Sequence, residues 1–148
     1  MAIEEIEDFM VEVPILNPEG ATCIAKLECT VRCWIEEGCL RDKSKIELSA
    51  PGVAVAATAD DFFHALIQIR EKLEPEGWRV LCYGASLKVW PSGMSLQMSG
   101  GLRAIKREPG RPLSINDVVD IFGTGPDVVP ATIAEQREYI RKAAAADH

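Results

Sequence analysis

Apolar and polar side chains alternate with a period of two over residues 21–36. The odd positions from Cys23 to Ile35 are apolar, whereas most of the even positions between them are charged or carry a hydroxyl group. This pattern is typical of a β-strand that buries one of its faces. A strand of this length exceeds the usual range, so we expect it to contain a bulge or a strong twist.

Other segments predict further strands. Ile46 and Leu48 are apolar at even-numbered positions, whereas the apolar side chains of residues 53–57 fall on odd-numbered positions. The intervening Ala50-Pro51-Gly52 fits either a tight hairpin or a bulged continuation, and the sequence does not choose between them. Shorter strands are expected at residues 11–13, 78–84, 87–90 and 102–107.

Two segments combine helical spacing with capping residues near the middle of the chain. The main predicted helix covers residues 59–73, with Thr58 as its N-cap, Asp61 at position N3 and an apolar stripe at 3.6-residue spacing. Ser114 is expected to cap a short helix over residues 115–122.

The two ends of the chain also show helical signals. Thr132 and Glu135 match a capping box for a last helix that runs to about residue 145. The acidic segment 1–10 has apolar residues at helix-like spacing and is interpreted as a short helix or an ordered arm. Residues 37–43 and 91–101 are expected to be loops.

The order of these elements indicates an α+β fold, with helices packed on one face of a mostly antiparallel sheet. The chain has 148 residues, which fits a single domain over residues 1–148. Hydrophobic residues make up 47% of the sequence, so a core can form without disulfide or metal staples.

The chain contains 5 cysteines, and we expect them to be reduced and free of metal. Cys23, Cys29 and Cys33 fall on the apolar parity of the long strand, which predicts that they point into the core. Cys29 and Cys33 would lie about 13 Å apart along a strand, too far for a disulfide or a shared zinc ion. Cys39 follows a glycine in an expected turn and is the candidate for an exposed thiol.

The formal net charge of −7 is distributed unevenly. Residues 1–20 contain six acids and no base, whereas residues 79–112 contain six bases and one acid. An acidic protein repels nucleic acid and membrane phosphates, so we expect neither as a partner. The acidic segment is either a solvated tail or a surface for a basic protein. The basic stretch is either an anion site or the polar side of two strands.

Two features that the sequence lacks indicate in which cellular compartment the protein resides. No apolar run approaches the about 20 residues of a membrane-spanning helix. The N-terminal segment has no basic residue before its acids, which excludes the pattern of a secretory signal or a transit peptide. We therefore expect a soluble, cytoplasmic protein.

The candidate catalytic chemistry is sparse. His64 is the only histidine inside the predicted fold, and helical spacing places it opposite the apolar stripe. The sequence has no Gly-x-Ser-x-Gly elbow, no Walker loop and no dinucleotide fingerprint. Asp60 and Asp61 open the main helix, where carboxylates favour the helix dipole. We therefore expect a non-enzymatic domain with no cofactor and no bound metal.

The segment 90–101 mixes Trp90, Met94 and Met98 with small polar residues. Either this segment folds back onto the core, or it presents an adaptable recognition surface of the kind that methionine and tryptophan often form.

Several short motifs carry a resemblance over about residues 58–135. They include Asp60-Asp61-Phe62-Phe63, Gly77-Trp78, Cys82-Tyr83-Gly84-Ala85-Ser86, Pro91-Ser92-Gly93-Met94, Val119-Asp120-Ile121-Phe122 and Gly125-Pro126-Asp127. In these motifs the chain resembles a family of small bacterial proteins, some of which are immunity proteins that neutralise polymorphic or contact-dependent toxins. The resemblance implies an inhibitor of one cognate toxin and brings no established catalytic or binding residues.

The lead hypothesis is a protein-binding domain that neutralises a toxin, which is expected to be basic because an acidic inhibitor is steered onto a basic target. The residues predicted to contact this partner are Trp90, Met94, Met98, Asp60, Asp61, Asp120 and Asp127. The alternative is a small-molecule or anion-binding domain, or an enzyme, that uses the 90–101 loop with Arg79, Lys88 and Arg103. A structural subunit of a larger assembly is the third hypothesis.

Overall fold

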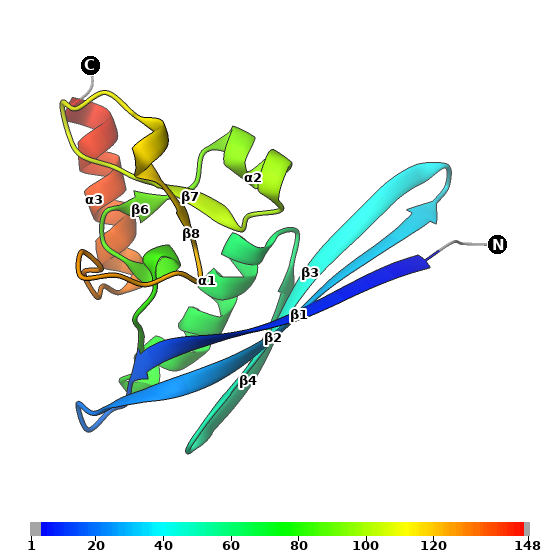
Figure 1. Cartoon of the computed structure of the whole chain (residues 1–148), viewed down its shortest axis with the longest axis horizontal. Helices are drawn as coiled ribbons and strands as arrows, with labels where there is room; N and C mark the ends of the chain where they lie inside the picture. Colours follow the sequence, from blue (N-terminus) through cyan, green and yellow to red (C-terminus); the bar gives the residue numbers. More distant parts are fainter. Residues whose placement is uncertain (1–3, 147–148) are drawn as a thin grey trace.

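The computed structural model describes residues 4–146, which form two antiparallel sheets and three α-helices (Figure 1). The larger sheet has the strand order β4-β3-β2-β1-β5. Its strands are β1 (Glu4–Leu16), β2 (Thr22–Glu36), β3 (Cys39–Ala50), β4 (Val53–Ala59) and β5 (Arg79–Val80). The predicted α+β fold with a mostly antiparallel sheet is confirmed.

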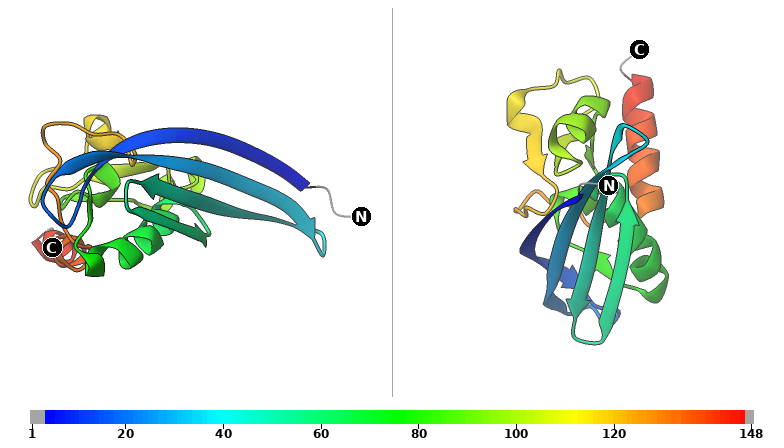
Figure 2. Two further views of the ribbon diagram at one scale, coloured as in Figure 1. Left: turned by 90° about the horizontal axis from the view of Figure 1, so that it is seen from below. Right: turned by 90° about the vertical axis from the view of Figure 1, so that its right-hand side faces the viewer.

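The predicted alternation over 21–36 is confirmed and sets the two faces of the larger sheet. Leu27 and Cys29 of β2 lie opposite Leu48 and Ile46 of β3, and all four side chains are buried toward α1. The even positions of β2 are mostly exposed on the opposite face. The pairing of β2 with β1 and β3 runs residue by residue, and the sheet accommodates its length by curving (Figure 2).

Residues 4–10 form the first half of β1, so the short helix predicted in this segment is wrong. The reason is strand pairing, because every residue of β1 has a partner in β2 and its inner side chains, such as Phe9 and Val13, follow a period of two. Residues 1–3, which belong to the same prediction, lie outside the described residues.

The loop predicted at 37–43 is also wrong, since β3 already begins at Cys39. Glu37 and Gly38 form a two-residue turn with φ angles of 51° and 76°. Positive φ angles at both central residues match the twist of the flanking strands, so β2 and β3 can pair up to their ends. The break after β3 is likewise a tight hairpin, with Pro51 and Gly52 between β3 and β4.

Helix α1 (Phe62–Leu73) packs its buried face on the larger sheet. Its N-cap is Asp61, whose carboxylate accepts a hydrogen bond of 2.8 Å from the backbone N–H of His64. Thr58, the predicted N-cap, lies within β4 instead. The strand continues to Ala59 because this residue still pairs with β3, and the helix therefore starts three residues later than its sequence pattern suggests.

The smaller sheet has the order β6-β7-β8. Its strands are β6 (Val89–Trp90), β7 (Arg103–Lys106) and β8 (Val118–Asp120). The helix predicted over 115–122 is wrong beyond its first turn, because residues 118–120 pair with β7 after a single 3₁₀ turn, Ile115–Asp117. The strand predicted at 78–84 is reduced to β5, which a second 3₁₀ turn, Tyr83–Ala85, follows.

The loop predicted at 91–101 contains a helix instead, α2 (Gly93–Ser99). Ser92 and Ser95 cap its start reciprocally, each hydroxyl accepting from the backbone N–H of the other at 3.0 and 2.9 Å. Serine replaces the usual Glu or Gln at the N3 position, which hides this capping box in the sequence.

Helix α3 (Ile133–Ala146) begins with the capping box that the sequence predicts. The Thr132 hydroxyl accepts from the backbone N–H of Glu135 at 3.1 Å, and the Glu135 carboxylate accepts from that of Thr132 at 2.9 Å. None of the helices within residues 4–146 has both the length and the apolar run that crossing a bilayer requires.

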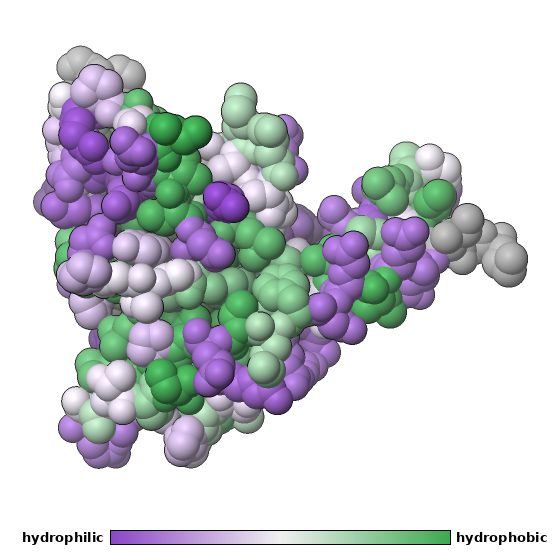
Figure 3. All heavy atoms as spheres, in the orientation of Figure 1, coloured by the Kyte–Doolittle hydropathy of each residue, from purple (hydrophilic) through white to green (hydrophobic). Residues whose placement is uncertain are grey.

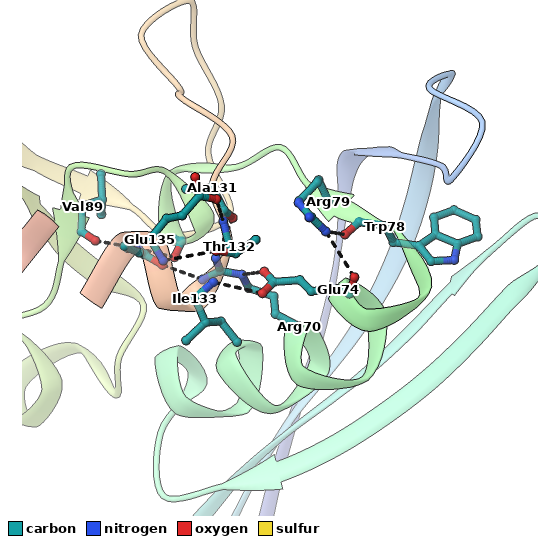
Figure 4. Close-up of polar contacts among 11 residues, drawn as sticks. Arg70, Glu74, Trp78, Arg79, Val89, Ala131, Thr132, Ile133 and Glu135 are labelled. Carbon is teal, nitrogen blue, oxygen red and sulfur yellow. Dashed lines mark hydrogen bonds and ion pairs between the residues drawn. The ribbon is translucent and has the colours of Figure 1, made fainter. Parts of the chain in front are cut away.

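A fully buried arginine, Arg70 of α1, joins α1 to α3 (Figure 4). Its Nε donates to Glu74 at 2.9 Å, its Nη1 to the side chain of Gln136 at 2.6 Å, and its Nη2 to the carbonyl of Ala131 at 3.0 Å. Gln136 in turn donates to the carbonyl of Val89 at 2.7 Å. The network therefore connects both long helices to the smaller sheet.

Replacing Arg70 with alanine is expected to lower the free energy of unfolding by about 3–5 kcal/mol, because Glu74 and Gln136 lose a buried partner. The matched control is Arg137→Ala at an exposed position of α3, which should change this free energy by less than about 0.5 kcal/mol. Urea denaturation followed by tryptophan fluorescence measures both variants. Equal losses for the two variants would contradict the structural role of Arg70.

Candidate protein-binding surface

The larger sheet is much longer than the helix that covers it. The 15 residues of β2 span about 50 Å at about 3.3 Å per residue, whereas the 12 residues of α1 span about 18 Å. One end of β1, β2 and β3 therefore projects from the body of the molecule (Figure 2). We call this projection the arm; it comprises residues 4–7 and 31–43, beyond the last β3–β4 pair at Ser44 and Ala59.

The two faces of the arm carry different side chains. Its inner face continues the face that packs on α1, because the strand registers run without interruption to the tip. The residues of this inner face are Glu5, Glu7, Val31, Cys33, Ile35, Leu40 and Asp42. They combine three acids with four apolar side chains, and no base is among them.

The acids of the inner face lie on neighbouring strands and have no ion-pair partner among residues 4–146. Glu5 of β1 and Asp42 of β3 lie opposite Cys33, one on each side of β2. The pKa of the Cys33 thiol is raised mainly by burial and further by the negative charges of Asp42, Glu5 and Glu7. Among residues 4–146, no cation forms an ion pair with any of these three carboxylates. Their negative charge is therefore uncompensated on this face.

The charges of the outer face are largely compensated by pairing. Arg32 pairs with Glu4 across the β1–β2 ladder, and its guanidinium lies 5.0 Å from the centroid of the Trp34 ring. Lys43 pairs with Asp60 at the base of the arm. The negative charge that the arm presents to a partner is thus concentrated on its inner face.

Ile35 and Leu40 form an exposed apolar pair near the tip of the inner face. They lie directly opposite each other in the β2–β3 ladder, and 47% and 75% of their surfaces are exposed. The acids Glu5 and Asp42 lie one row nearer the body, on either side of Cys33. Exposed apolar side chains next to charged groups are common in protein–protein interfaces.

Helix α2 forms the second wall of an open notch at the base of the arm (Figures 1 and 3). The carbonyl of Gly100, at the end of α2, accepts a hydrogen bond of 2.9 Å from the backbone N–H of Phe62, which fixes α2 to the start of α1. Met94 and Met98 are 70% and 81% exposed on α2 and fit the recognition-surface alternative. Trp90 fits the other alternative, because it packs edge-on against a buried phenylalanine ring.

Asp60 and Asp61 lie at the base of the arm, and both have partners. The hydrogen bond and charge of Lys43 lower the pKa of Asp60, whose side chain remains 82% exposed. The Asp61 carboxylate caps α1 and also lies 2.8 Å from Nδ1 of His64, so the His64–Asp61 pair has a structural explanation. A Cβ atom at Gly101, which follows α2, would lie 2.7 Å from Oδ1 of Asp61 and 2.8 Å from the backbone nitrogen of Phe63, so only glycine permits this close approach to the start of α1.

Asp120 and Asp127, the remaining predicted contact residues, belong to neither the arm nor the notch. The Asp120 carboxylate accepts from the backbone N–H of Phe122 at 2.9 Å. The Asp127 carboxylate accepts from the hydroxyl of Tyr83 at 2.6 Å and from Nζ of Lys106 at 3.1 Å, and these bonds lower its pKa. The structure therefore does not gather the seven predicted residues on one surface.

A cavity of about 540 Å³ lies beside the smaller sheet. Lys88, Lys106 and Arg111 line it, and each pairs with an acid at 3.0, 3.1 and 2.7 Å respectively. These acids are Glu108, Asp127 and Asp117. Arg79 and Arg103, the other bases proposed for an anion site, do not line the cavity, and its paired bases offer an anion little net positive charge.

Sequence reasoning missed Asp42, Ile35 and Leu40 as surface residues. The alternation of odd and even positions in a strand predicts the face on which a side chain lies, but it does not predict the length of the helix that covers that face. One signal was available, since the predicted strand at 21–36 would span about 50 Å and the predicted helix at 59–73 only about 22 Å. An uncovered end of the sheet follows from this difference.

Comparison with known proteins assigns no family to this surface. No family model matches the chain, and no curated protein matches it significantly in sequence. Within residues 4–146, no group of three or more histidine, cysteine, aspartate or glutamate side chains is placed to hold a metal ion. The acids of the arm are therefore described by their charge and position alone.

The thiols are expected to react with an alkylating agent at very different rates. Cys39 is exposed, whereas burial raises the pKa of Cys29 to about 12 and that of Cys82 to about 11. At pH 8 we expect Cys39 to react first and the two buried thiols only after unfolding, because the thiolate is the reactive form. Peptide mapping of quenched samples by mass spectrometry measures the rates. Equally fast labelling of Cys82 in the folded protein would contradict the structure.

The alkylation rate of Cys33 depends on the negative charge of the inner face. The triple variant Glu5→Gln, Glu7→Gln, Asp42→Asn is expected to speed Cys33 alkylation by about two- to fivefold, because its pKa falls when the nearby negative charges are removed. The control variant carries the same change on the outer face and consists of Asp8→Asn, Glu28→Gln and Glu47→Gln. A rate that changes equally in both variants would show that the charge around Cys33 is not local.

Proposed function

We propose that this chain is a non-enzymatic protein-binding domain, that the inner face of its arm holds a basic partner, and that the partner is a toxin which the chain neutralises. The observation that carries the proposal is the inner face itself, where three acids without an ion-pair partner among residues 4–146 lie next to exposed apolar side chains on a projecting part of the sheet. The toxin as partner rests on the resemblance to immunity proteins.

The charge of the arm favours fast capture of a basic partner. Glu5, Glu7 and Asp42 project beyond the body, where solvent surrounds them and no described cation neutralises them. Charge complementarity of this kind raises the association rate and the specificity of a complex more than its final affinity. An inhibitor needs this property if it must reach its toxin before the toxin reaches its target.

The apolar residues of the surface favour a stable complex. Ile35 and Leu40 on the arm and Met94 and Met98 on α2 are all exposed. Burying apolar side chains against a partner contributes about 25 cal/mol per Å². Methionine also adapts to an irregular partner surface, because it is unbranched and flexible.

The location that the proposal implies is the cytoplasm, and the cysteines support it. Cys33 and Cys39 lie on the arm as free thiols, and the five cysteines form no disulfide within the described residues. Free thiols on a recognition surface suit a reducing compartment.

The partner is tested by capture and by toxicity. The tagged full-length chain is incubated at low ionic strength with an extract of the organism that encodes it, and the bound protein is released with salt. Native mass spectrometry gives its stoichiometry. We expect a basic protein in a fixed ratio, whose expression alone arrests growth and whose co-expression with this chain restores it. A captured protein that has no effect on growth would exclude the toxin as partner.

Reversing the charge of the inner face is expected to slow association with the captured partner at least about tenfold at low salt, and to remove most of its salt dependence. The variant is Glu5→Lys, Glu7→Lys, Asp42→Lys. The control reverses the same number of charges on the outer face, at Asp8, Glu28 and Glu47. Stopped-flow or surface-plasmon kinetics measures both variants, and an equal effect of the two would reject the inner face as the binding surface.

A further inference from the structure

The outer edge of β1 is open over most of its length. On the side away from β2, β1 pairs only with β5, through Ile15 and Leu16. The backbone carbonyl of Pro14 also accepts a hydrogen bond of 2.9 Å from the N–H of Leu81. No strand within the described residues 4–146 pairs with this edge from Glu4 to Val13.

The backbone groups that face the open edge belong to the even-numbered residues. The N–H and C=O of one residue point to the same side of a strand, and successive residues alternate. Because the Pro14 carbonyl points toward β5, residues 4, 6, 8, 10 and 12 present their backbone N–H and C=O groups to the open edge. Proline has no N–H, so this row of donors ends where β5 begins.

We propose that an extended segment of the basic partner adds to the larger sheet as a new strand beside β1. The inference rests on the proposed function, since it takes the same partner, and it adds the way in which that partner is held. Backbone hydrogen bonds to an exposed sheet edge are a general means of binding extended peptides. Here the edge is ten residues long, from Glu4 to Val13.

The side chains along the edge specify a basic segment. Residues 4–13 carry five acids and no base. In an added strand, side chains on the inner face would lie next to Glu5 and Glu7, where lysine or arginine is favoured. Side chains on the outer face would lie next to three further acids, Glu4, Asp8 and Glu12. They would also lie next to Ile6 and Met10, which are 58% and 54% exposed and favour apolar residues. The segment that fits is therefore extended and rich in basic residues, with apolar residues among them.

The same charges oppose pairing with a second copy of this chain. Two β1 edges side by side would bring ten acids and no base into one pair of strands, and like charges directly opposite each other destabilise a sheet. Charged edges of this type keep soluble proteins from pairing with themselves. A basic strand instead turns this repulsion into attraction.

The probe is a nine-residue peptide of alternating lysine and valine, added to the full-length chain. The control peptide has the same side chains, but its backbone is N-methylated at every residue, so that neither of its edges can donate the hydrogen bonds of a strand. Isothermal titration calorimetry gives the affinities, and amide hydrogen exchange followed by NMR gives the protection of each edge N–H.

We expect the unmodified peptide to bind and to slow exchange at the N–H groups of Ile6, Asp8, Met10 and Glu12 by at least about tenfold. The N-methylated peptide should bind at least about fivefold more weakly. Met10→Pro removes one edge N–H and should weaken binding of the unmodified peptide, whereas Met10→Ala keeps that N–H and should bind nearly as the parent does. Proline is tolerated on the free side of an edge strand, and thermal unfolding verifies that both variants are folded.

Three results would overturn strand addition and are distinguishable from failure of the proposed function. If both peptides bind equally, the edge amides stay unprotected, and the reversal of Glu5, Glu7 and Asp42 still abolishes binding, then the inner face holds the partner by charge and strand addition is rejected. If the edge amides are protected without peptide and sedimentation shows a dimer, a second copy occupies the edge. If neither peptide binds, strand addition is rejected, whereas the basic partner is still decided by capture and by the charge reversal of the inner face.

Discussion

A buried guanidinium holds the layers of this protein together. Arg70 has no access to solvent, and a charge removed from water must be matched by hydrogen bonds. Glu74 supplies one of these bonds from the 3₁₀ turn that follows α1, and Gln136 and Ala131 supply the others from α3 and the segment before it. Apolar contacts tolerate small displacements, whereas the planar fork of an arginine fixes the direction of each partner. The position of the smaller sheet is fixed as well, because Gln136 also donates a hydrogen bond to the carbonyl of Val89.

Local patterns predicted the elements that depend on local interactions. The alternation over 21–36 identified β2 and the burial of Cys29, and the capping box at Thr132 located the start of α3. The errors concern segments whose conformation depends on a distant partner. Residues 4–10 match a helical period, yet they form a strand because the ladder with β2 satisfies their backbone groups. Residues 118–120 form a strand for the same reason, through β7.

The candidate surface could be predicted in part. The acidity of the first twenty residues indicated a charged surface, and the composition of 90–101 singled out Met94 and Met98, which are exposed on α2. The position of Asp42 on the same face as Glu5, with Cys33 between them, depends on the register of two hairpins, and no local pattern in the sequence contains that register. A buried arginine in a helix has the same local pattern as an exposed one, so Arg70 was equally hidden.

The arm has no hydrophobic core of its own. Val31 and Cys33 are half-buried, and Ile35 and Leu40 are exposed, so the arm is held mainly by the backbone ladder between β2 and β3. That ladder accepts many different side chains, whereas the body around α1 accepts few. The residues that would contact a partner and the residues that stabilise the fold thus lie at different ends of the same strands. Over evolutionary time the tip can change its sequence to follow a changing partner, while the residues that maintain the fold stay the same.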